Sequence, residues 1–148
     1  MAYRALPRPQ FSALQKNIFP PYFTLQTLAP LAMWLTYPRS LISALTASSS
    51  ATSTSSDKLN AYLISTMLVT ALLNLAYVGP QTTEVMRLRK HQETRDGKKS
   101  YDSGPHSSEM QSLNRRFGVL HGVSSMVNLV GFGAMVWYGG VLGEGMKL

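Results

Sequence analysis

Cysteine is absent from this chain of 148 residues, and no recognisable catalytic or metal-binding pattern takes its place. The absence excludes disulfides, thiolate nucleophiles and thiolate metal ligands. The three histidines do not stand at a metal-ligand spacing, and neither a glycine-rich phosphate loop nor a Gly-x-Ser-x-Gly nucleophile motif occurs. We therefore expect no enzymatic activity, no cofactor and no metal site.

Charge is also scarce, because only 14% of the residues are Asp, Glu, Lys or Arg. They crowd into the first sixteen positions and residues 84–116, which leaves uncharged tracts at residues 18–37, 59–83 and 117–143. A hydrocarbon layer about 30 Å thick is crossed by about 20 helical residues, so each tract is long enough to span it. Lipid-crossing backbone must satisfy its own hydrogen bonds, and alternating barrel strands are missing. We predict an all-α integral membrane protein, one domain over residues 1–148, with transmembrane helices at 18–37, 59–79 and 117–141.

The first of these tracts is the least convincing span, because it contains Pro20, Pro21, Pro30 and Gln26. Membrane helices tolerate proline better than soluble helices do, since neighbouring groups can satisfy the freed carbonyl. We interpret Pro20 and Pro21 as the start of the helix and Pro30 as a kink. An interfacial or re-entrant segment is the alternative.

Basic residues alternate between many and few along the chain, and this pattern predicts an orientation. Residues 1–17 and 80–116 are rich in Lys and Arg, whereas the serine-rich segment 38–58 and the C-terminus contain few. Basic residues near span ends are retained on the cytoplasmic side. We therefore place residues 1–17 and the basic loop 80–116 in the cytoplasm, and the flexible segment 38–58 outside it.

The net charge of +7 does not predict nucleic-acid binding, because the basic cluster directly follows a span and holds no interleaved aromatic residues. Retention of basic residues on the cytoplasmic side alone explains this cluster. A further interpretation is that Arg87, Arg89 and Lys90 contact anionic lipid headgroups, at about 1 kcal/mol each.

The third tract carries small and polar residues at helical spacing. Gly118 and Gly122 form a Gly-x-x-x-Gly pair with Ser125 one turn beyond, which permits close approach of another helix. A polar stripe follows the i, i+3, i+4, i+7 pattern at His121, Ser124, Ser125 and Asn128. This stripe is expected to face protein.

Depth along the helices suggests partners for the stripe. His121 and Asn74 each lie about 6 Å inside the cytoplasmic ends of their spans, so we predict that they meet. Asn128 would then reach Thr66 or Thr70. The spans contain no carboxylate, so an ion pump built on intramembrane Asp or Glu is not expected. A polar pore or substrate pocket around His121 is the alternative to packing.

Several short segments resemble the transmembrane protein 205-like family of small eukaryotic membrane proteins, particularly its fungal members; they are residues 5–8, 17–23, 74–86 and 117–129. The resemblance implies a multi-pass helical membrane protein without an established molecular activity, and it adds Pro80 to the candidate residues. Family members carry four membrane helices, and the chain begins almost at the segment that follows the first of them. We therefore expect either a shortened form or a start that was placed late.

Two classes of function fit these observations. The first is a non-enzymatic membrane component that acts through helix packing, as a homo-oligomer or with a membrane-protein partner. The second is a small-solute channel or transporter, or its subunit, that uses the polar stripe. The endomembrane system or the plasma membrane is the expected location. A mitochondrial membrane is the alternative, because the basic N-terminus resembles a presequence that Pro7 and Pro9 weaken.

Overall fold

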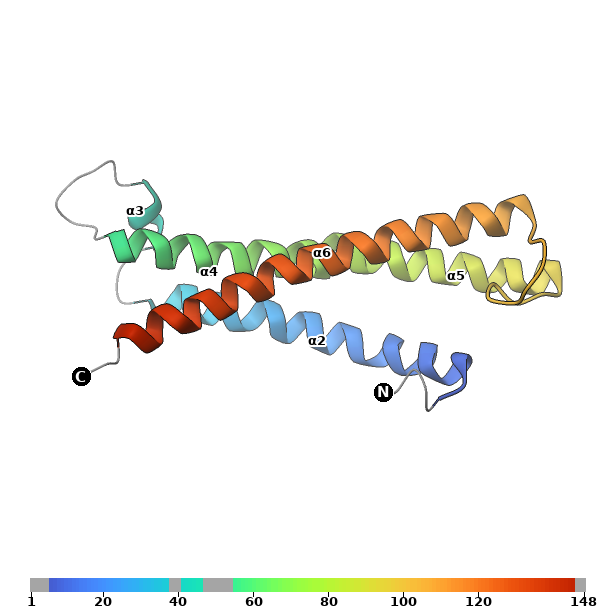
Figure 1. The fold of residues 1–148 in the computed structure, drawn as a ribbon, viewed down its shortest axis with the longest axis horizontal. Helices are drawn as coiled ribbons and strands as arrows, with labels where there is room; N and C mark the ends of the chain where they lie inside the picture. Colours follow the sequence, from blue (N-terminus) through green and yellow to red (C-terminus); the bar gives the residue numbers. More distant parts are fainter. Residues whose placement is uncertain (1–5, 38–40, 47–54, 146–148) are drawn as a thin grey trace.

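The computed structural model describes residues 6–37, 41–46 and 55–145, and every regular element in these ranges is helical. The elements are α2 (Arg8–Thr36), α3 (Leu41–Thr46), α4 (Ser55–Leu73), the π-helix η1 (Asn74–Val78), α5 (Gly79–Asp96) and α6 (Ser108–Gly145). Helices α4, η1 and α5 form one continuous rod, and α6 returns antiparallel along it (Figure 1). The predicted all-α class is confirmed for the described residues.

Among the described residues, two helical stretches are long and apolar enough to cross a membrane, Ser56–Asp96 and Ser108–Glu144. They contain the predicted spans 59–79 and 117–141. Helix α2 does not pass the same test, so the third crossing stays a prediction. Pro20, Pro21 and Pro30 all lie inside α2, which starts at Arg8 with a proline in its first turn. The sequence suggested that Pro20 and Pro21 begin the helix, but α2 begins upstream of both.

Most of the segment predicted as the basic cytoplasmic loop, residues 80–116, is helical. Helix α5 continues to Asp96 and α6 begins at Ser108, so only residues 97–107 connect them. Gly97 adopts a left-handed conformation with φ of 62°, and its N–H donates to the Glu93 carbonyl, which ends α5. Ser107 Oγ accepts a hydrogen bond from the Met110 N–H and caps the start of α6. Most of the predicted serine-rich segment 38–58 falls outside the described residues.

Ion pairs along α5 support the helical conformation of this strongly charged segment. Arg87 Nη2 lies 2.6 Å from Glu84 Oε1, and Lys90 Nζ lies 2.9 Å from Glu93 Oε2. Both pairs have i, i+3 spacing, which supports a helix by a few tenths of a kcal/mol, about 0.2–0.5 for each pair.

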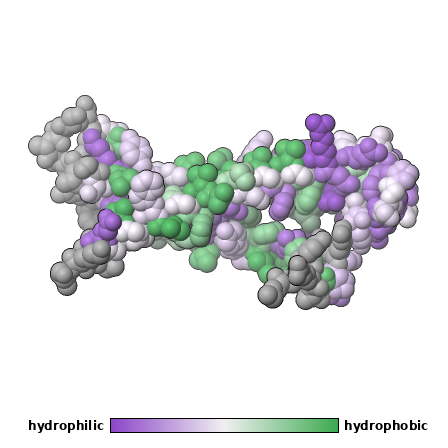
Figure 2. Space-filling view, in the orientation of Figure 1, coloured by the Kyte–Doolittle hydropathy of each residue, from purple (hydrophilic) through white to green (hydrophobic). Residues whose placement is uncertain are grey.

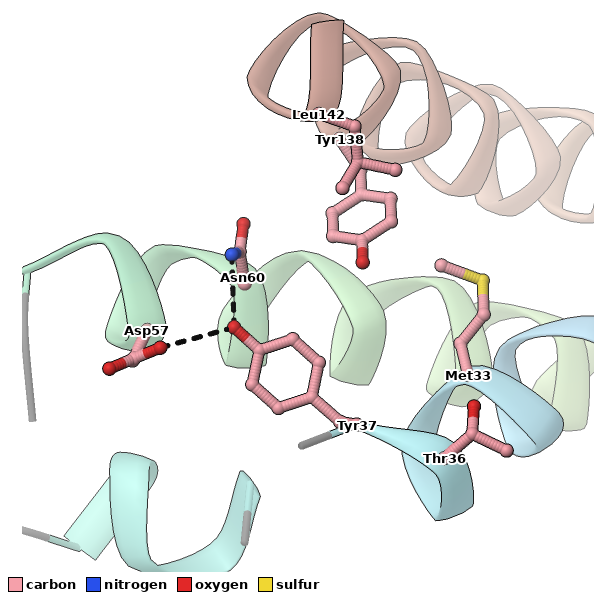
Figure 3. A pocket seen from close by; sticks show the side chains of 7 residues that line it. All are labelled: Met33, Thr36, Tyr37, Asp57, Asn60, Tyr138 and Leu142. Carbon is pink, nitrogen blue, oxygen red and sulfur yellow. Dashed lines mark hydrogen bonds between the residues drawn. The ribbon is translucent and has the colours of Figure 1, made fainter. Parts of the chain in front are cut away.

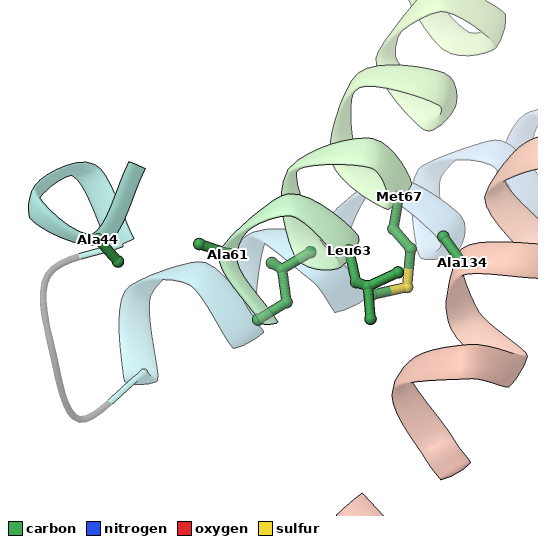
Figure 4. Close-up of a cluster of buried hydrophobic side chains, with 6 residues drawn as sticks. Ala44, Ala61, Leu63, Met67 and Ala134 are labelled. Carbon is green, nitrogen blue, oxygen red and sulfur yellow. The ribbon is translucent and has the colours of Figure 1, made fainter. Parts of the chain in front are cut away.

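The core is small compared with the apolar surface. Its main cluster joins α3, α4 and α6 through Ala44, Ala61, Leu63, Ile64, Met67 and Ala134 (Figure 4). Many large apolar side chains stay exposed, among them Leu25, Tyr77 and Trp137. The space-filling view shows apolar residues gathered over the middle of the molecule and hydrophilic residues at the end that holds the α5–α6 connection (Figure 2).

Candidate functional site

Helices α2, α4 and α6 and the π-helix η1 meet at a group of buried and partly buried polar residues, which we call the polar seam: Gln26, Thr70, Asn74, Ser124 and Asn128. Asn74 is fully buried. Its Nδ2 donates to Asn128 Oδ1 at 3.0 Å and lies 3.4 Å from the Ser124 carbonyl oxygen. The seam thus fastens η1 to α6 through an amide pair.

Gly131 lies at the closest approach of α4 and α6. A Cβ atom at this position would be only 2.6 Å from Thr70 Oγ1 and 3.9 Å from Gln26 Nε2. Only glycine fits this spacing without a shift of a neighbour, and the two contacts show that α2 joins the crossing. Gly131 was not among the residues predicted from the sequence. Its position three residues after Asn128, on the same helical face, was the available signal.

A π-helical turn carries Asn74. The Gly79 N–H donates to the Asn74 carbonyl, and a Cβ on Gly79 would lie 2.7 Å from that oxygen. Pro80 follows directly; it lacks an N–H, and its ring would crowd the carbonyl four residues earlier in a regular helix. A wider turn before Pro80 relieves this crowding. Pro80 itself is exposed, so it shapes the helix beside the polar seam and does not join it.

The seam contains hydrogen-bond acceptors that the described part of the protein leaves without a donor. They are Asn74 Oδ1 and Gln26 Oε1, both buried. Buried amide oxygens usually bind a donor, often an ordered water. The seam residues are all neutral, so the site can accept hydrogen bonds but cannot perform acid–base chemistry. No group of three or more metal-ligating side chains occurs within the described residues.

The structure divides the polar stripe predicted on α6. Ser124 and Asn128 face the seam, whereas Gly118, His121, Gly122 and Ser125 are exposed. A Cβ atom on Gly118 or Gly122 would meet nothing within 4 Å. We call these four exposed residues the outer small-residue face.

The predicted contact between Asn74 and His121 is wrong. Asn74 pairs with Asn128 instead, which lies seven residues, or about 10 Å of helix, farther from the hairpin connection than His121. The prediction used only the depth of each residue within its own span. The α5–α6 hairpin, which it did not consider, sets the register of α6 against η1. His121 stacks on Phe117, with ring centroids 6.0 Å apart. The predicted contact of Asn128 with Thr66 or Thr70 is replaced by the amide pair, because both threonine hydroxyls donate to carbonyls of their own helix.

The hairpin end is organised around Glu93, which is nearly buried. Its Oε1 accepts hydrogen bonds from the Ser100 N–H and hydroxyl, and its Oε2 accepts one from Lys90. Burial by itself raises the pKa of Glu93, but the hydrogen bonds from Ser100 and Lys90 outweigh it and hold the pKa below its ordinary value. Glu93 therefore fixes the connection to α5 as a carboxylate.

The three basic residues predicted to contact anionic lipid have different surroundings. Arg87 pairs with Glu84, and Lys90 pairs with Glu93. The Arg89 guanidinium lies 4.6 Å from the centre of the Phe117 ring, and burial lowers the pKa of Arg89. Lipid binding by these residues stays a prediction.

The opposite end of the molecule holds a feature that the sequence analysis missed, which we call the terminal pocket. It has a volume of ≈ 390 Å³ and lies where α2, α4 and α6 meet. Tyr37 Oη accepts a hydrogen bond from Asn60 Nδ2 at 3.0 Å and donates to Asp57 Oδ1 at 3.3 Å (Figure 3). Sequence spacing gives no signal for it, because its residues come from three distant segments.

The sequence matches the family described as a domain of unknown function, DUF4149, over residues 1–91, which is more than half of the chain. The chain belongs to the DUF4149 family. The DUF4149 match includes Gln26, Thr70 and Asn74 of the polar seam and ends before α6. No curated protein and no solved structure matches the chain significantly. The finer resemblance to the transmembrane protein 205-like family stays a prediction.

Proposed function

We propose that this DUF4149 protein is a three-span membrane protein without enzymatic activity, which acts through contacts of its helices with other membrane helices. The polar seam holds its own helices in register. The outer small-residue face of α6 is the surface that another copy or a partner subunit contacts. The resemblance to transmembrane protein 205-like proteins supports the multi-pass arrangement.

The exposure of α6 carries this proposal. Only 11% of its most apolar stretch is buried within the protein. The core helix of a soluble protein is mostly buried, whereas α6 leaves large side chains exposed: Val119, Val123, Met126, Leu129, Val130, Phe132, Met135, Val136 and Trp137. An apolar surface of this extent requires lipid or another apolar partner.

Helix α2 supports the third crossing through its surface. Leu25, Leu28 and Leu35 are all more than half exposed, at 69%, 54% and 74%. Its inner side supplies Gln26 to the seam, so one face contacts protein and the other is apolar. This division is what a membrane helix at the edge of a bundle needs.

Self-association through the outer small-residue face can be tested with single cysteines, because the natural chain has none. We expect Gly122→Cys to form disulfide-linked dimers in native membranes under mild oxidation. A Cβ atom at this position would meet nothing within 4 Å among the described residues, so the substitution is compatible with folding. The matched control is Val123→Cys, which is also exposed but turned about 100° around the helix. Equal crosslinking of both variants, or of neither, would contradict self-association through this face.

A solute pathway is the second candidate, and it has less support. The Asn128 side chain, which was expected to line it, is engaged with Asn74 inside one chain, and Asn74 also bonds the backbone carbonyl of Ser124. Only His121 and Ser125 of the polar stripe remain on the exposed side, and Ser125 Oγ donates to the His121 carbonyl. Flux into vesicles that is lost in His121→Ala would favour transport over the packing proposal.

We place the protein in the endomembrane system or the plasma membrane, with the mitochondrial membrane as the alternative. The alternation of basic residues along the chain supports retention of the hairpin end in the cytoplasm. Co-localisation of a tagged chain with a mitochondrial marker would show that the mitochondrial membrane is the location.

A further inference from the structure

We propose that Arg89 binds the phosphate group of an anionic phospholipid at the hairpin end of the apolar helices. This binding rests on the membrane placement proposed above and is separate from helix packing. Of the three basic residues predicted to contact anionic lipid, Arg89 alone forms no ion pair with the described residues. Arg87 is paired with Glu84, and Lys90 is paired with Glu93.

The Arg89 guanidinium is held in place while its outer donors stay open. Its Cζ lies 4.6 Å from the centre of the Phe117 ring, and Phe117 in turn stacks on His121 with 5° between the ring planes. Aromatic faces attract a guanidinium and hold its position. Nε is buried without a hydrogen-bond partner, whereas neither Nη atom is enclosed or hydrogen-bonded within the described part of the chain. Open Nη groups can donate two parallel hydrogen bonds to a phosphate.

The charges around Arg89 favour an anion as its ligand. Glu93 acts on Arg89 by charge, but both of its carboxylate oxygens already accept hydrogen bonds from other residues. Arg115 and Arg116, directly before the apolar tract of α6, also form no ion pair with the described residues. Residues 80–116 contain eight Lys and Arg against five Asp and Glu. The hairpin end therefore keeps an excess of positive charge.

The position of Arg89 along the helices favours a lipid over a free phosphate. Phe117 is the first residue of the uncharged tract 117–143, so the guanidinium lies at the level where the apolar part of α6 begins. Val119 and Val123 continue from this level along α6, and both are exposed. In the proposed membrane placement this level is the headgroup layer, where juxtamembrane Lys and Arg attract anionic lipids. One phospholipid can thus meet Arg89 with its phosphate and the exposed valines with its acyl chains.

Native mass spectrometry of the full chain in detergent tests this site. We expect the wild type, offered equal amounts of phosphatidylglycerol and phosphatidylcholine with the same acyl chains, to retain phosphatidylglycerol about tenfold more strongly. Arg89→Gln should lower the retention of phosphatidylglycerol about fivefold. Arg89→Lys keeps the charge but not the paired donors and should lower it less. Phe117→Leu keeps an apolar side chain but removes the ring that positions Arg89, so it should also weaken retention.

Arg87→Gln is the matched control, because it removes the same charge from a neighbouring exposed position that is already paired with Glu84. It should leave the retention of phosphatidylglycerol nearly unchanged. Equal losses in Arg87→Gln and Arg89→Gln would show attraction by net charge alone and overturn the assignment to Arg89.

Two further results would overturn the phospholipid as the ligand. The first is saturable binding of inorganic phosphate in lipid-free detergent, followed by ³¹P NMR and lost in Arg89→Gln, without a preference between the two lipids. The second is a wild type that enters phosphatidylcholine bilayers but shows no headgroup preference, which leaves the membrane placement intact. A wild type that stays folded in buffer without detergent and binds neither lipid would contradict the membrane placement itself.

Discussion

Asn74 links two features that are adjacent in space, the π-helical turn and the polar seam. Its carbonyl accepts the wide-turn hydrogen bond from Gly79, and its side chain donates to Asn128. Backbone and side chain of one residue thus couple the shape of the rod to the position of α6. In an apolar environment such a neutral pair contributes modestly, about 0.6 kcal/mol on average, and its larger effect is on register.

A double-mutant cycle measures this pair. We expect Asn74→Ala and Asn128→Ala to show a coupling free energy of about 0.6 kcal/mol, and no more than about 1.7, in reversible unfolding of the protein in bicelles. The control cycle replaces Asn128→Ala with Ser125→Ala, because Ser125 donates to its own helix on the exposed side. Independent sites add within about 0.3–0.5 kcal/mol. Additive effects for Asn74 and Asn128 would show that the pair makes no contribution.

Close approach at Gly131 is the second feature at the scale of single residues. We expect Gly131→Ala to lower the free energy of unfolding by about 1–3 kcal/mol, because its Cβ would collide with Thr70 Oγ1. Adding Thr70→Ala should recover part of this loss by removing the colliding atom. Gly133→Ala is the matched control, since a Cβ there meets nothing within 4 Å. Equal thermal unfolding of the two alanine variants would refute the close approach.

At the scale of elements, the α5–α6 hairpin sets the register of the whole rod against α6. Arg116 Nη2 donates to Gln81 Oε1 at 3.2 Å, which joins α6 to α5 between the connection and the seam. The connection itself is fixed by Glu93 and by Ser107, whose hydroxyl lies 2.6 Å from Asp96 Oδ2. A change in this connection would therefore shift which residues of α6 face Asn74.

The lowered pKa of Glu93 predicts a pH-dependent connection. A carboxyl whose pKa is lower in the folded state stabilises that state at a pH above its ordinary pKa of 4.5. The stabilisation is lost as the pH falls through the pKa of the folded state. We expect the ¹⁵N NMR signal of the Ser100 amide to report release of the connection over that acidic range.

Glu93→Gln should remove this response. Glu84→Gln should retain it, although the Arg87 hydrogen bond lowers the pKa of Glu84 too, because Glu84 is exposed and far from Ser100. An unchanged response in Glu93→Gln would contradict this role.

Sequence patterns predicted the apolar helices because the length of an uncharged tract is a local property of the sequence. They did not predict that α5 is helical, because the charges of residues 80–116 were interpreted only as a sign of cytoplasmic placement, whereas their i, i+3 pairing is the signal for a helix. The structure brings the predicted residues Asn74 and Asn128 together, but the partner of Asn74 depended on a hairpin register that local pattern does not contain. The Gly-x-x-x-Gly pattern predicted close approach at Gly118 and Gly122, whereas the close contact between helices of this chain is at Gly131.

At the scale of the whole molecule, the small core leaves a broad apolar surface exposed. The buried cluster combines three alanines with Leu63, Ile64 and Met67, so three helices approach closely without enclosing much apolar area. The exposed apolar side chains over the middle of the molecule then contact lipid in the proposed arrangement (Figure 2). Hydrophilic residues at the hairpin end would stay in water, and α4 and α6 would cross the bilayer antiparallel.

Labelling of single cysteines in sealed membrane vesicles tests this crossing most directly, because the natural chain offers no competing thiol. Ser103→Cys lies in the hairpin connection, Glu144→Cys near the far end of α6, and Val130→Cys between them. We predict that an impermeant maleimide labels Ser103→Cys and Glu144→Cys from opposite sides of the membrane. Val130→Cys should react from neither side until detergent is added. Labelling of all three positions from one side in intact vesicles would contradict the account.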